Sequence, residues 1–288
     1  MFLKKIFYQL KLINHNKKFF KEYEKPLYKK ELNFLIEFNG FSYHHLMLSH
    51  MMDYFKKKFD TNFYSYPSHA LLSYPIENSI SKKIKIFLLK LSGLGTYGLY
   101  KSLGIQNYID FIIDKKIKKK TRIFIEKKMP KNKRGVLDLK INNIVIGDLI
   151  YDTYLKKYRD SYPTLEVKSK KFLDFLEEFL NLFFIWEKIF EEKKINRVIL
   201  SHSEYSMGLP ARICLSKGGV SYLIEYDRLV KINKNFCYRY SSSKNYKKDF
   251  DKFPEKLKKI FIKKAKLKLN ERVNGSINDI PYMTKSAY

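Results

Sequence analysis

A histidine flanked by serines and a glutamate offers the clearest chemistry in the chain. The segment 201–205, Ser-His-Ser-Glu-Tyr, directly follows a predicted strand, Arg197–Leu200, and precedes a predicted helix. Open α/β sheets bind ligands at such strand ends, where a histidine can act as a general base or donate to a phosphate or sugar hydroxyl. A loop histidine hydrogen-bonded to backbone is an equally supported alternative for His202. We take His202, Glu204 and Tyr205 as candidate site residues.

Two carboxylates four residues apart form a second candidate site. The segment 147–152, Gly-Asp-Leu-Ile-Tyr-Asp, begins a predicted helix, so Asp148 and Asp152 can lie on one face of it. Asp148 alone is also explained as the N-cap of this helix, a role that needs no chemistry. Capping does not explain Tyr151 and Asp152, which indicate a helix start that faces a cleft. We expect both to bind substrate, with Asp148 the candidate base after His202.

Two further histidines, His44 and His45, come just after the first predicted strand, Leu32–Phe38. Strand-end loops in an open parallel sheet gather on one side, so we expect this loop to lie along the same edge as Asp148 and His202. Both histidines are therefore further candidates for substrate binding. The convergence of three polar loops is stronger evidence for a site than any one of them.

The remaining motifs indicate neither a resident cofactor nor a metal. Residues 93–98, Gly-Leu-Gly-Thr-Tyr-Gly, match the GxGxxG pattern of dinucleotide-binding loops, but the preceding segment is typical of a helix, not of a buried strand. A turn between two helices explains this motif better. Cys214 and Cys237 form neither a disulfide framework nor a CxxC pair. The sequence has no HExxH, P-loop or GxSxG motif, so we predict no metal site and find no hydrolase or NTPase signature.

The elements that must position these residues alternate between strands and helices. A predicted helix, Met207–Lys217, is stopped by two glycines and lies between the strands Arg197–Leu200 and Val220–Glu225. This is a βαβ unit, which requires parallel strands and a right-handed crossover. We expect Asn143–Ile146 in the same parallel sheet. The other expected strands are Leu32–Phe38, Asn62–Ser65 and Ile123–Glu126, and the other expected helices are Ser42–Lys58, Ile80–Leu91, one from Asp148, Ser169–Lys193 and Pro254–Leu269.

These elements predict an α/β fold, a Rossmann-like parallel sheet with flanking helices and basic helical segments at both termini. Residues 1–30 form a basic amphipathic segment, which can lie on a membrane or, better supported, pack on the domain. Residues 31–240 form the Rossmann-like domain, and residues 241–288 a lysine-rich helix and a linker-like tail. No apolar run reaches the roughly 20 residues of a membrane helix, and no cleavable signal is recognised. We expect a cytoplasmic protein, with peripheral association at the inner face of the inner membrane left open.

The net charge of the chain limits the classes of partner that it can bind. The 288 residues include 58 Lys and Arg against 29 Asp and Glu, a formal net charge of +29, and only eight of the basic residues are arginine. Abundant Asn, Ile, Phe and Tyr with scarce Ala, Gly and Pro are typical of an AT-rich genome. Proteins that read nucleic acid rely on arginine forks, so a nucleic-acid partner is not favoured. Attraction to an anionic membrane surface needs only point charges and stays open.

Three segments of the chain resemble bacterial surface-polysaccharide biosynthesis proteins, which act in capsule or lipopolysaccharide synthesis. The segments are residues 146–155 (IGDLIYDTYL), 198–205 (VILSHSEY) and 208–213 (GLPARI). Such proteins are similar to glycosyltransferases with two Rossmann domains, the GT-B type. Their amino-terminal half holds the acceptor and their carboxyl-terminal half the nucleotide sugar. The resemblance implies five cleft residues, Asp148, Asp152, His202, Glu204 and Tyr205.

The resemblance also implies a nucleotide sugar as co-substrate and a lipid-linked or oligosaccharide acceptor. Residues 1–270 account for one half of such an enzyme, so we expect the donor site on a separate domain or subunit. We expect little transfer by the chain alone, because nothing would surround the donor phosphates. The alternative function is a non-catalytic basic protein that binds nucleic acid or an anionic membrane surface. A contiguous lysine stripe with interleaved aromatics would favour binding, and an even scatter would favour genome bias.

Overall fold

The computed structural model describes residues 2–19, 26–40, 42–67, 87–88, 93, 95–109, 111–158, 164–225, 229–233 and 246–274. The chain divides into two compact units, Met1–Arg239 and Tyr240–Tyr288, and each is described by itself. Most of the predicted helix Ile80–Leu91 lies outside the described residues, as does Cys237.

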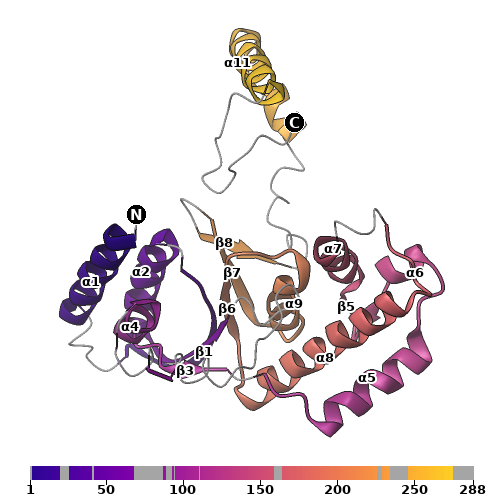
Figure 1. The fold of residues 1–288 in the computed structure, drawn as a ribbon. Coiled ribbons are helices and arrows are strands. Elements are labelled where there is room, and N and C mark those ends of the chain that lie inside the picture. Colours follow the sequence, from indigo (N-terminus) through magenta and orange to yellow (C-terminus); the bar gives the residue numbers. More distant parts are fainter. Residues whose placement is uncertain are drawn as a thin grey trace. The chain divides into compact units, whose positions relative to one another are not determined.

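One six-stranded sheet forms the centre of the first unit, in the order β3-β2-β1-β6-β7-β8 (Figure 1). All neighbouring strands are parallel except β7 and β8. The chain starts in the middle of the sheet, runs out through β2 to β3, and returns to place β6 beside β1. This doubly wound order confirms the predicted Rossmann-like α/β fold. The strands are β1 (Tyr28–Phe38), β2 (Phe59–Pro67), β3 (Asn107–Tyr108), β6 (Arg197–Leu200), β7 (Val220–Ile224) and β8 (Leu229–Ile232).

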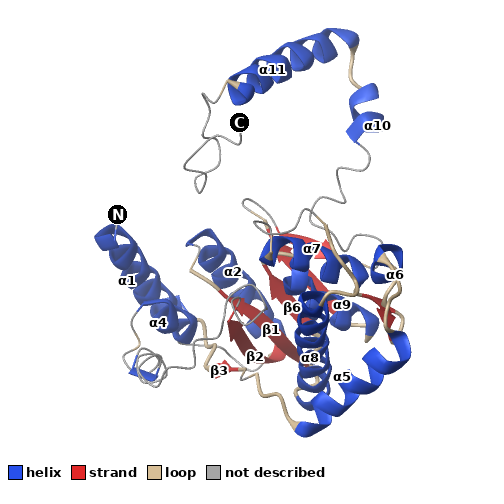
Figure 2. Ribbon diagram, turned by 45° about the vertical axis from the view of Figure 1, so that its right-hand side comes forward, coloured by secondary structure: helices blue, strands red, loops and turns tan. Residues whose placement is uncertain are grey.

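Helices cover both faces of the sheet (Figures 1 and 2). Of the helices that the structure describes, α1 (Phe2–Phe19), α2 (Ser42–Lys58) and α4 (Gly95–Ser102) lie on one face. The other face carries α5 (Lys115–Lys128), α6 (Lys133–Leu137), α7 (Gly147–Lys157), α8 (Lys170–Glu192) and α9 (Leu209–Ser216). Each face of the sheet has its own hydrophobic core, the first beneath α1, α2 and α4 and the second beneath α5 to α9. The central strand β1 contributes to both, because Phe34 and Ile36 are buried in the first core and Leu35 in the second. Alternate side chains of a strand point to opposite faces, so a strand buried on both faces is apolar throughout.

The long helix α8 is the main buried element of the second core. Ser169 is its N-cap and accepts a hydrogen bond from the Phe172 N–H at 3.2 Å, and Lys193 is its C-cap. The predicted helix Ser169–Lys193 is therefore confirmed, and its first and last residues are the two caps. Its aromatic stripe packs on the sheet, where the Trp186 and Tyr66 ring centroids lie 5.0 Å apart.

The predicted strand Ile123–Glu126 is wrong, because these residues belong to α5. Asp114 caps this helix by accepting the Ile117 N–H at 2.8 Å. Ile117 and Thr121 form the buried face of α5 against α8, where Thr121 Oγ1 donates to Asn181 Oδ1 at 2.7 Å. The short apolar run is part of a period-3.6 stripe, and its length was too small to distinguish helix from strand.

The predicted strand Asn143–Ile146 is not in the parallel sheet. Its core, β5 (Ile144–Val145), pairs antiparallel with β4 (Lys140–Ile141) in a separate two-stranded sheet. The turn residues Asn142 and Asn143 have φ values of 49° and 64°. Two consecutive residues with positive φ are typical of a tight hairpin, and asparagine tolerates that conformation. The hairpin leads directly into α7.

The GxGxxG segment forms a turn that begins α4. Gly93 and Gly95 both have a φ of 61°, a conformation that favours glycine. A Cβ at Gly98 would overlap the backbone carbonyl of Gly93, so the segment needs a glycine for this close approach. The helix α4 then packs on α1.

The amino-terminal helix α1 packs on the rest of the first unit. Leu12 and Ile13 are buried in the core with residues of α2 and α4. Asn16 Nδ2 donates to Ser102 Oγ at 3.0 Å, and Ser49 Oγ donates to Asn16 Oδ1 at 3.2 Å. The better supported alternative for residues 1–30, a helix packed on the domain, therefore describes α1.

The described part of the second unit consists of α10 (Tyr246–Asp251) and α11 (Glu255–Val273) with the residues that join them. The ring of Phe253, between the two helices, contacts the ring of Phe261 in α11 edge-on. In the described part of the chain, no helix combines the length and the apolar character needed to cross a membrane.

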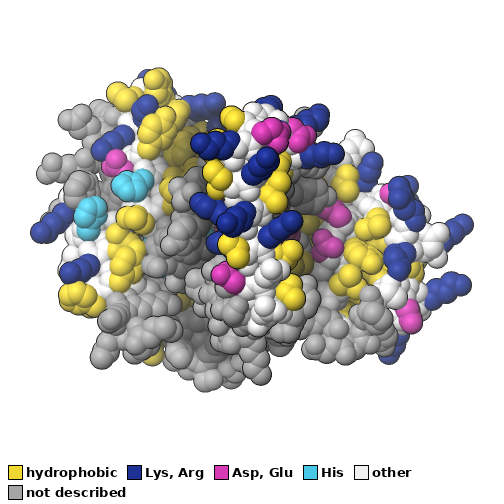
Figure 3. All heavy atoms as spheres, turned by 90° about the horizontal axis from the view of Figure 1, so that it is seen from above, with side chains coloured by type: hydrophobic (Ala, Val, Ile, Leu, Met, Phe, Trp, Pro, Cys, Tyr) yellow, Lys and Arg dark blue, Asp and Glu magenta, His cyan; other side chains and the backbone are white. Residues whose placement is uncertain are grey.

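Lys and Arg side chains are interspersed with hydrophobic ones over the face drawn in Figure 3.

Candidate functional site

The reversal of strand order places two strand-end loops side by side. The strands β1 and β6 pair in parallel, with Phe34 opposite Arg197 and Ile36 opposite Ile199. The segments that follow these strands therefore leave the sheet at the same edge. In open α/β sheets, the crevice at the carboxyl ends of the strands where the order reverses is the usual ligand site.

A hydrogen-bonded chain of three side chains joins these two loops. Glu37, near the end of β1, is 4% exposed. Its carboxylate accepts the Ser201 backbone N–H at 2.5 Å and the Ser201 hydroxyl at 2.8 Å. Ser201 Oγ in turn lies 2.7 Å from Nδ1 of His202. His202, a predicted site residue, is thus half-buried at the reversal and linked to a carboxyl that the sequence analysis had not singled out.

Burial raises the pKa of Glu37 above its ordinary value, and the two hydrogen bonds from Ser201 oppose this rise. The sequence did contain a signal for this residue. Glu37 is the only charged residue in the otherwise mainly apolar segment 32–38, LNFLIEF. A carboxyl in a strand buried on both faces needs a hydrogen-bond partner or a positive charge, so Glu37 could have been recognised as a candidate.

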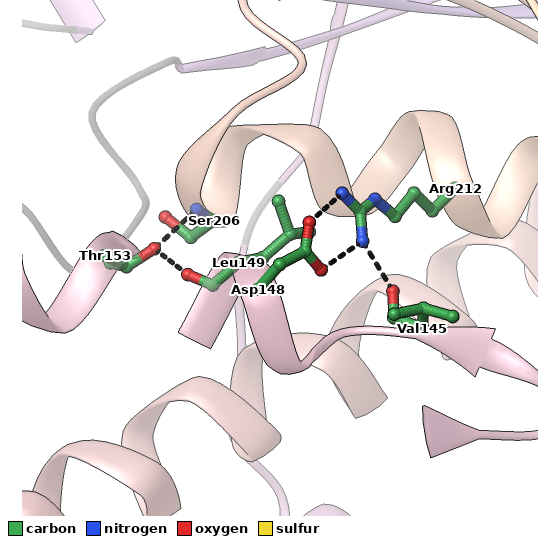
Figure 4. Close-up of polar contacts among 6 residues, drawn as sticks. All are labelled: Val145, Asp148, Leu149, Thr153, Ser206 and Arg212. Carbon is green, nitrogen blue, oxygen red and sulfur yellow. Dashed lines mark hydrogen bonds and ion pairs between the residues drawn. The ribbon is translucent and has the colours of Figure 1, made fainter. Parts of the chain in front are cut away.

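The loop after β6 is tightly closed. The 3₁₀-helix η1 (Tyr205–Gly208) begins with Tyr205 at a φ of 56°, in the left-handed region that bulky residues rarely adopt. A Cβ at Gly208 would overlap the carbonyl oxygen of Ser203. Ser206 N–H donates to Thr153 Oγ1 of α7 at 2.8 Å (Figure 4). Strained residues of this kind concentrate at functional sites, where the surrounding structure holds them in place.

Asp148 and Arg212 form a bidentate ion pair between α7 and α9 (Figure 4). The two terminal guanidinium nitrogens, Nη1 and Nη2, each donate to one carboxylate oxygen at 2.6 Å, and Nη1 also donates to the Val145 carbonyl at 2.7 Å. The N-cap of α7 is Ile146, without a side-chain hydrogen bond, so the capping alternative for Asp148 is wrong. The ion pair instead ties the start of α7 to α9. Arg212 was part of the recognised segment 208–213 but was not proposed as a site residue.

The helix α7 brings charged side chains to the loop after β6. Lys156 Nζ lies 4.1 Å from the centroid of the Tyr205 ring. Partial desolvation and the negative charges of Asp148 and Glu204 raise the pKa of Asp152. Desolvation lowers the pKa of Lys156. The structure therefore gathers four predicted residues, Asp148, Asp152, Glu204 and Tyr205, around the contact of α7 with this loop.

The two histidines after β1 are at the predicted edge but are each only 1% exposed. His44 Nδ1 lies 2.6 Å from Nδ2 of Asn39, and His45 Nε2 lies 2.9 Å from the Asn39 carbonyl oxygen. The Asn39 N–H donates to the Tyr100 hydroxyl at 3.1 Å. This geometry assigns His44 and His45 to holding the turn between β1 and α2, and it leaves little of their surface for a substrate.

The last predicted site residue, Tyr151, is partly buried and packs against the core cluster that contains the aromatic residues of α8. Among the described residues, no group of three or more His, Cys, Asp or Glu side chains is placed to hold a metal ion. A hollow of about 560 Å³ lies in the second unit, lined by Tyr246, Lys247, Asp249, Phe250 and Phe253. None of the predicted site residues lines it.

The site therefore consists of a half-buried histidine with a hydrogen-bonded serine and glutamate, next to a cluster of carboxylates. Fold alone does not determine function, so the function must be argued from these groups. Comparison of the chain with protein-family models, with curated proteins and with solved structures finds no match in any of the three.

Proposed function

We propose that the chain is a glycosyltransferase-like protein of bacterial surface-polysaccharide synthesis, and that its first unit binds a lipid-linked or oligosaccharide acceptor. The observation that carries the proposal is the position of His202 at the reversal of strand order. It is half-buried there and hydrogen-bonded to Ser201, which is bonded in turn to Glu37. The resemblance of residues 146–155, 198–205 and 208–213 to such proteins supports the same function.

Sugar transfer to a hydroxyl needs a base at the acceptor. The acceptor oxygen forms a bond to the anomeric carbon, the bond from that carbon to the nucleotide phosphate breaks, and the base takes the hydroxyl proton. His202 suits this role, because imidazole exchanges a proton near neutral pH. Asp148 suits it less, since Arg212 occupies both of its oxygens. Asp152 and Glu204 would accept hydrogen bonds from the hydroxyls of the acceptor sugar.

The proposal assigns the nucleotide sugar to a separate domain or subunit. Support comes from the arrangement of two-domain glycosyltransferases, in which acceptor and donor are held by different Rossmann-like sheets. The first unit contains one such sheet. The leaving phosphate would be stabilised by groups of the donor side, which also exclude water from the reacting centre.

The test is acceptor binding followed by transfer. Oligosaccharides prepared from bacterial surface polysaccharide are titrated into the purified chain by calorimetry, and transfer from a panel of nucleotide sugars is followed by mass spectrometry. We expect acceptor binding but little transfer by the chain alone. His202→Ala should lower any transfer obtained after a donor-binding protein is added by about 10²- to 10⁴-fold, whereas His50→Ala, at an exposed histidine of α2, should not. Failure to bind any oligosaccharide would contradict the proposal.

Attachment to an anionic membrane surface is the second candidate function, and α5 favours it. The buried face of α5 lies on α8, and its exposed residues are almost all basic. They include Lys115, Lys116, Lys118, Lys119, Lys120, Arg122, Lys127 and Lys128. Clustered lysines attract anionic lipids at about 1 kcal/mol each near the surface. This charge would hold the chain at the membrane beside a lipid-linked acceptor.

Sedimentation with lipid vesicles tests this attachment. The chain should sediment with anionic vesicles and not with zwitterionic ones, and the effect should weaken as salt screens the charge. Replacing Lys115, Lys116 and Lys119 by Glu should reduce sedimentation, while the same change at three lysines of α11 measures the share of the second unit. Equal sedimentation with both kinds of vesicle would contradict an electrostatic attachment. Tighter retention on single-stranded nucleic acid at the same salt would favour a nucleic-acid partner instead.

A further inference from the structure

The serine between Glu37 and His202 has only one hydroxyl proton to give. Ser201 Oγ lies 2.8 Å from Glu37 Oε1 and 2.7 Å from His202 Nδ1, so both neighbours are within hydrogen-bond distance. A hydroxyl donates one hydrogen bond and can accept two. The proton of Ser201 therefore points either to the glutamate or to the histidine, and the direction decides which ring nitrogen of His202 carries hydrogen.

An ionised Glu37 settles this direction. A carboxylate can only accept, and it already takes the Ser201 backbone N–H at its other oxygen, Oε2. The Ser201 hydroxyl must then donate to Oε1, and its oxygen is left to accept from Nδ1–H of His202. In a neutral imidazole with hydrogen on Nδ1, the nitrogen that can accept a proton is Nε2.

We propose that Glu37 is a positioning residue that acts through the Ser201 hydroxyl to keep hydrogen on Nδ1 of His202 and to make Nε2 the proton-accepting nitrogen. The use of Nε2 as the base toward an acceptor hydroxyl rests on the proposed function. The tautomer itself does not. In metal sites and in catalytic triads, a hydrogen bond to one ring nitrogen of a histidine commonly fixes the tautomer and leaves the other nitrogen to react.

The titratable groups that face Glu37 are two tyrosines and His202. Tyr66 faces it from β2 and Tyr100 from α4, and His202 from the loop after β6. Burial raises the pKa of both tyrosines, so their hydroxyls stay neutral. The Tyr100 hydroxyl donates to the backbone carbonyl of Glu37 at 2.7 Å and not to the carboxylate. Protonation of Glu37 would reverse the chain, because its O–H would donate to Ser201 and Ser201 to Nδ1.

The variant Glu37→Gln imposes this reversal without a change of shape. The backbone N–H of Ser201 is a fixed donor, so the amide carbonyl of the glutamine must face it. The amide NH₂ then faces Ser201 Oγ and donates to it. The serine hydroxyl is left to donate to His202 Nδ1, and hydrogen moves to Nε2.

Imidazole nitrogen resonances report the tautomer directly. The full chain is labelled with ¹⁵N-histidine, and long-range proton–nitrogen spectra are recorded at about pH 8, above the ordinary histidine pKa. His202→Asn identifies the His202 signals. We expect the Nδ1–H form in the native chain and the Nε2–H form in Glu37→Gln. Ser203→Ala, which removes a neighbouring buried serine outside the chain of three, should leave the native tautomer unchanged.

An Nε2–H form in the native chain would overturn the proposal, and so would an unchanged tautomer in Glu37→Gln. If that variant does not fold, Ser201→Ala serves instead. It removes the acceptor of Nδ1–H and should shift His202 toward the Nε2–H form, and no shift would overturn the proposal. Failure of the proposed function has a different signature, since the tautomers would then be as expected while His202→Ala leaves transfer unchanged.

Discussion

The loops that leave the two central strands both carry histidines, yet the fold uses them in opposite ways. After β1, His44 and His45 are each 1% exposed and are bound to the side chain and carbonyl of Asn39. After β6, His202 is half-buried and its Nδ1 is next to Ser201 Oγ. The same residue type at the same edge of one sheet is thus fully buried in one loop and half-buried beside a serine hydroxyl in the other.

The elements that follow explain the difference. The helix α2 begins at Ser42, soon after β1 ends at Phe38, so His44 and His45 lie within its first turn and are covered. After β6 the chain forms η1, with Tyr205 at positive φ, before α9 begins. This closed loop keeps His202 out of the core. Proximity to a strand end is therefore insufficient evidence for a catalytic histidine, and the hydrogen-bond partners of the ring must also be known.

The sharpest test of the comparison is sugar transfer by single histidine variants. In a complete assay with donor and acceptor, His202→Ala should lower turnover by about 10²- to 10⁴-fold, the usual contribution of a general base. His44→Ala should lower it only in proportion to the loss of folded protein. Turnover numbers, Michaelis constants and the folded fraction are measured for both variants.

A transition-state role requires that turnover and catalytic efficiency fall together in His202→Ala. If only acceptor affinity falls and the turnover number is unchanged, His202 is a binding residue and Asp148 remains as the candidate base. The two loops would then differ in substrate contact and not in catalysis.

Loss of the ion pair between Asp148 and Arg212, next to the loop after β6, should lower the unfolding free energy more than any other change proposed for these loops. Asp148→Ala leaves the buried Arg212 guanidinium without its carboxylate, and loss of one partner of a buried pair costs about 3 kcal/mol of unfolding free energy. The matched control is Asp138→Ala, which breaks the exposed pair with Arg134 and should cost less than about 1 kcal/mol. Denaturant unfolding measures both. Similar losses in the two variants would show that Asp148 does not tie α7 to α9.

Replacement of the buried histidines should have the next largest effect. His44→Ala and His45→Ala each remove a partner of Asn39, and a buried polar group left unsatisfied costs about 1–3 kcal/mol. His202→Ala should cost about 0.5 kcal/mol, near the range of surface substitutions. Thermal unfolding of the three variants ranks them. A larger loss for His202→Ala than for His44→Ala would reverse the assignment of the two loops.

The smallest expected effect is a pH dependence from Glu37. Its pKa is raised in the folded state, so its contribution to stability is fully present below the ordinary glutamate pKa and is lost as pH rises through the folded pKa. Glu37→Gln removes this titration. The stability of the native chain relative to the variant should therefore fall as the pH rises from the ordinary glutamate pKa through the raised pKa of the folded state. Unfolding of both proteins at several pH values measures the difference, and a constant or rising difference would contradict a raised pKa.

The sequence alone determined the elements whose signals are local. The helix Ser42–Lys58 and the strand Arg197–Leu200 have the predicted bounds, and α8 ends within one residue of the predicted Ser169–Lys193 at each terminus. Periodic apolar residues and capping side chains act over a few positions, so they can be read without knowledge of the fold. The sequence also nominated His202, because a polar group directly after a buried strand is recognisable from its position.

The tertiary structure alone decided which residues became partners. Glu37 and Ser201 are 164 positions apart, and Asp148 and Arg212 are 64 apart. No local pattern records that β6 returns to the side of β1, or that Asn143–Ile146 pairs with the preceding residues instead of joining the sheet. A hydrogen bond forms only where two groups approach within about 3 Å, and that approach is set by the packing of the whole sheet. The roles of His44 and His202 diverged for this reason, since burial and partners depend on neighbours that are distant in the sequence.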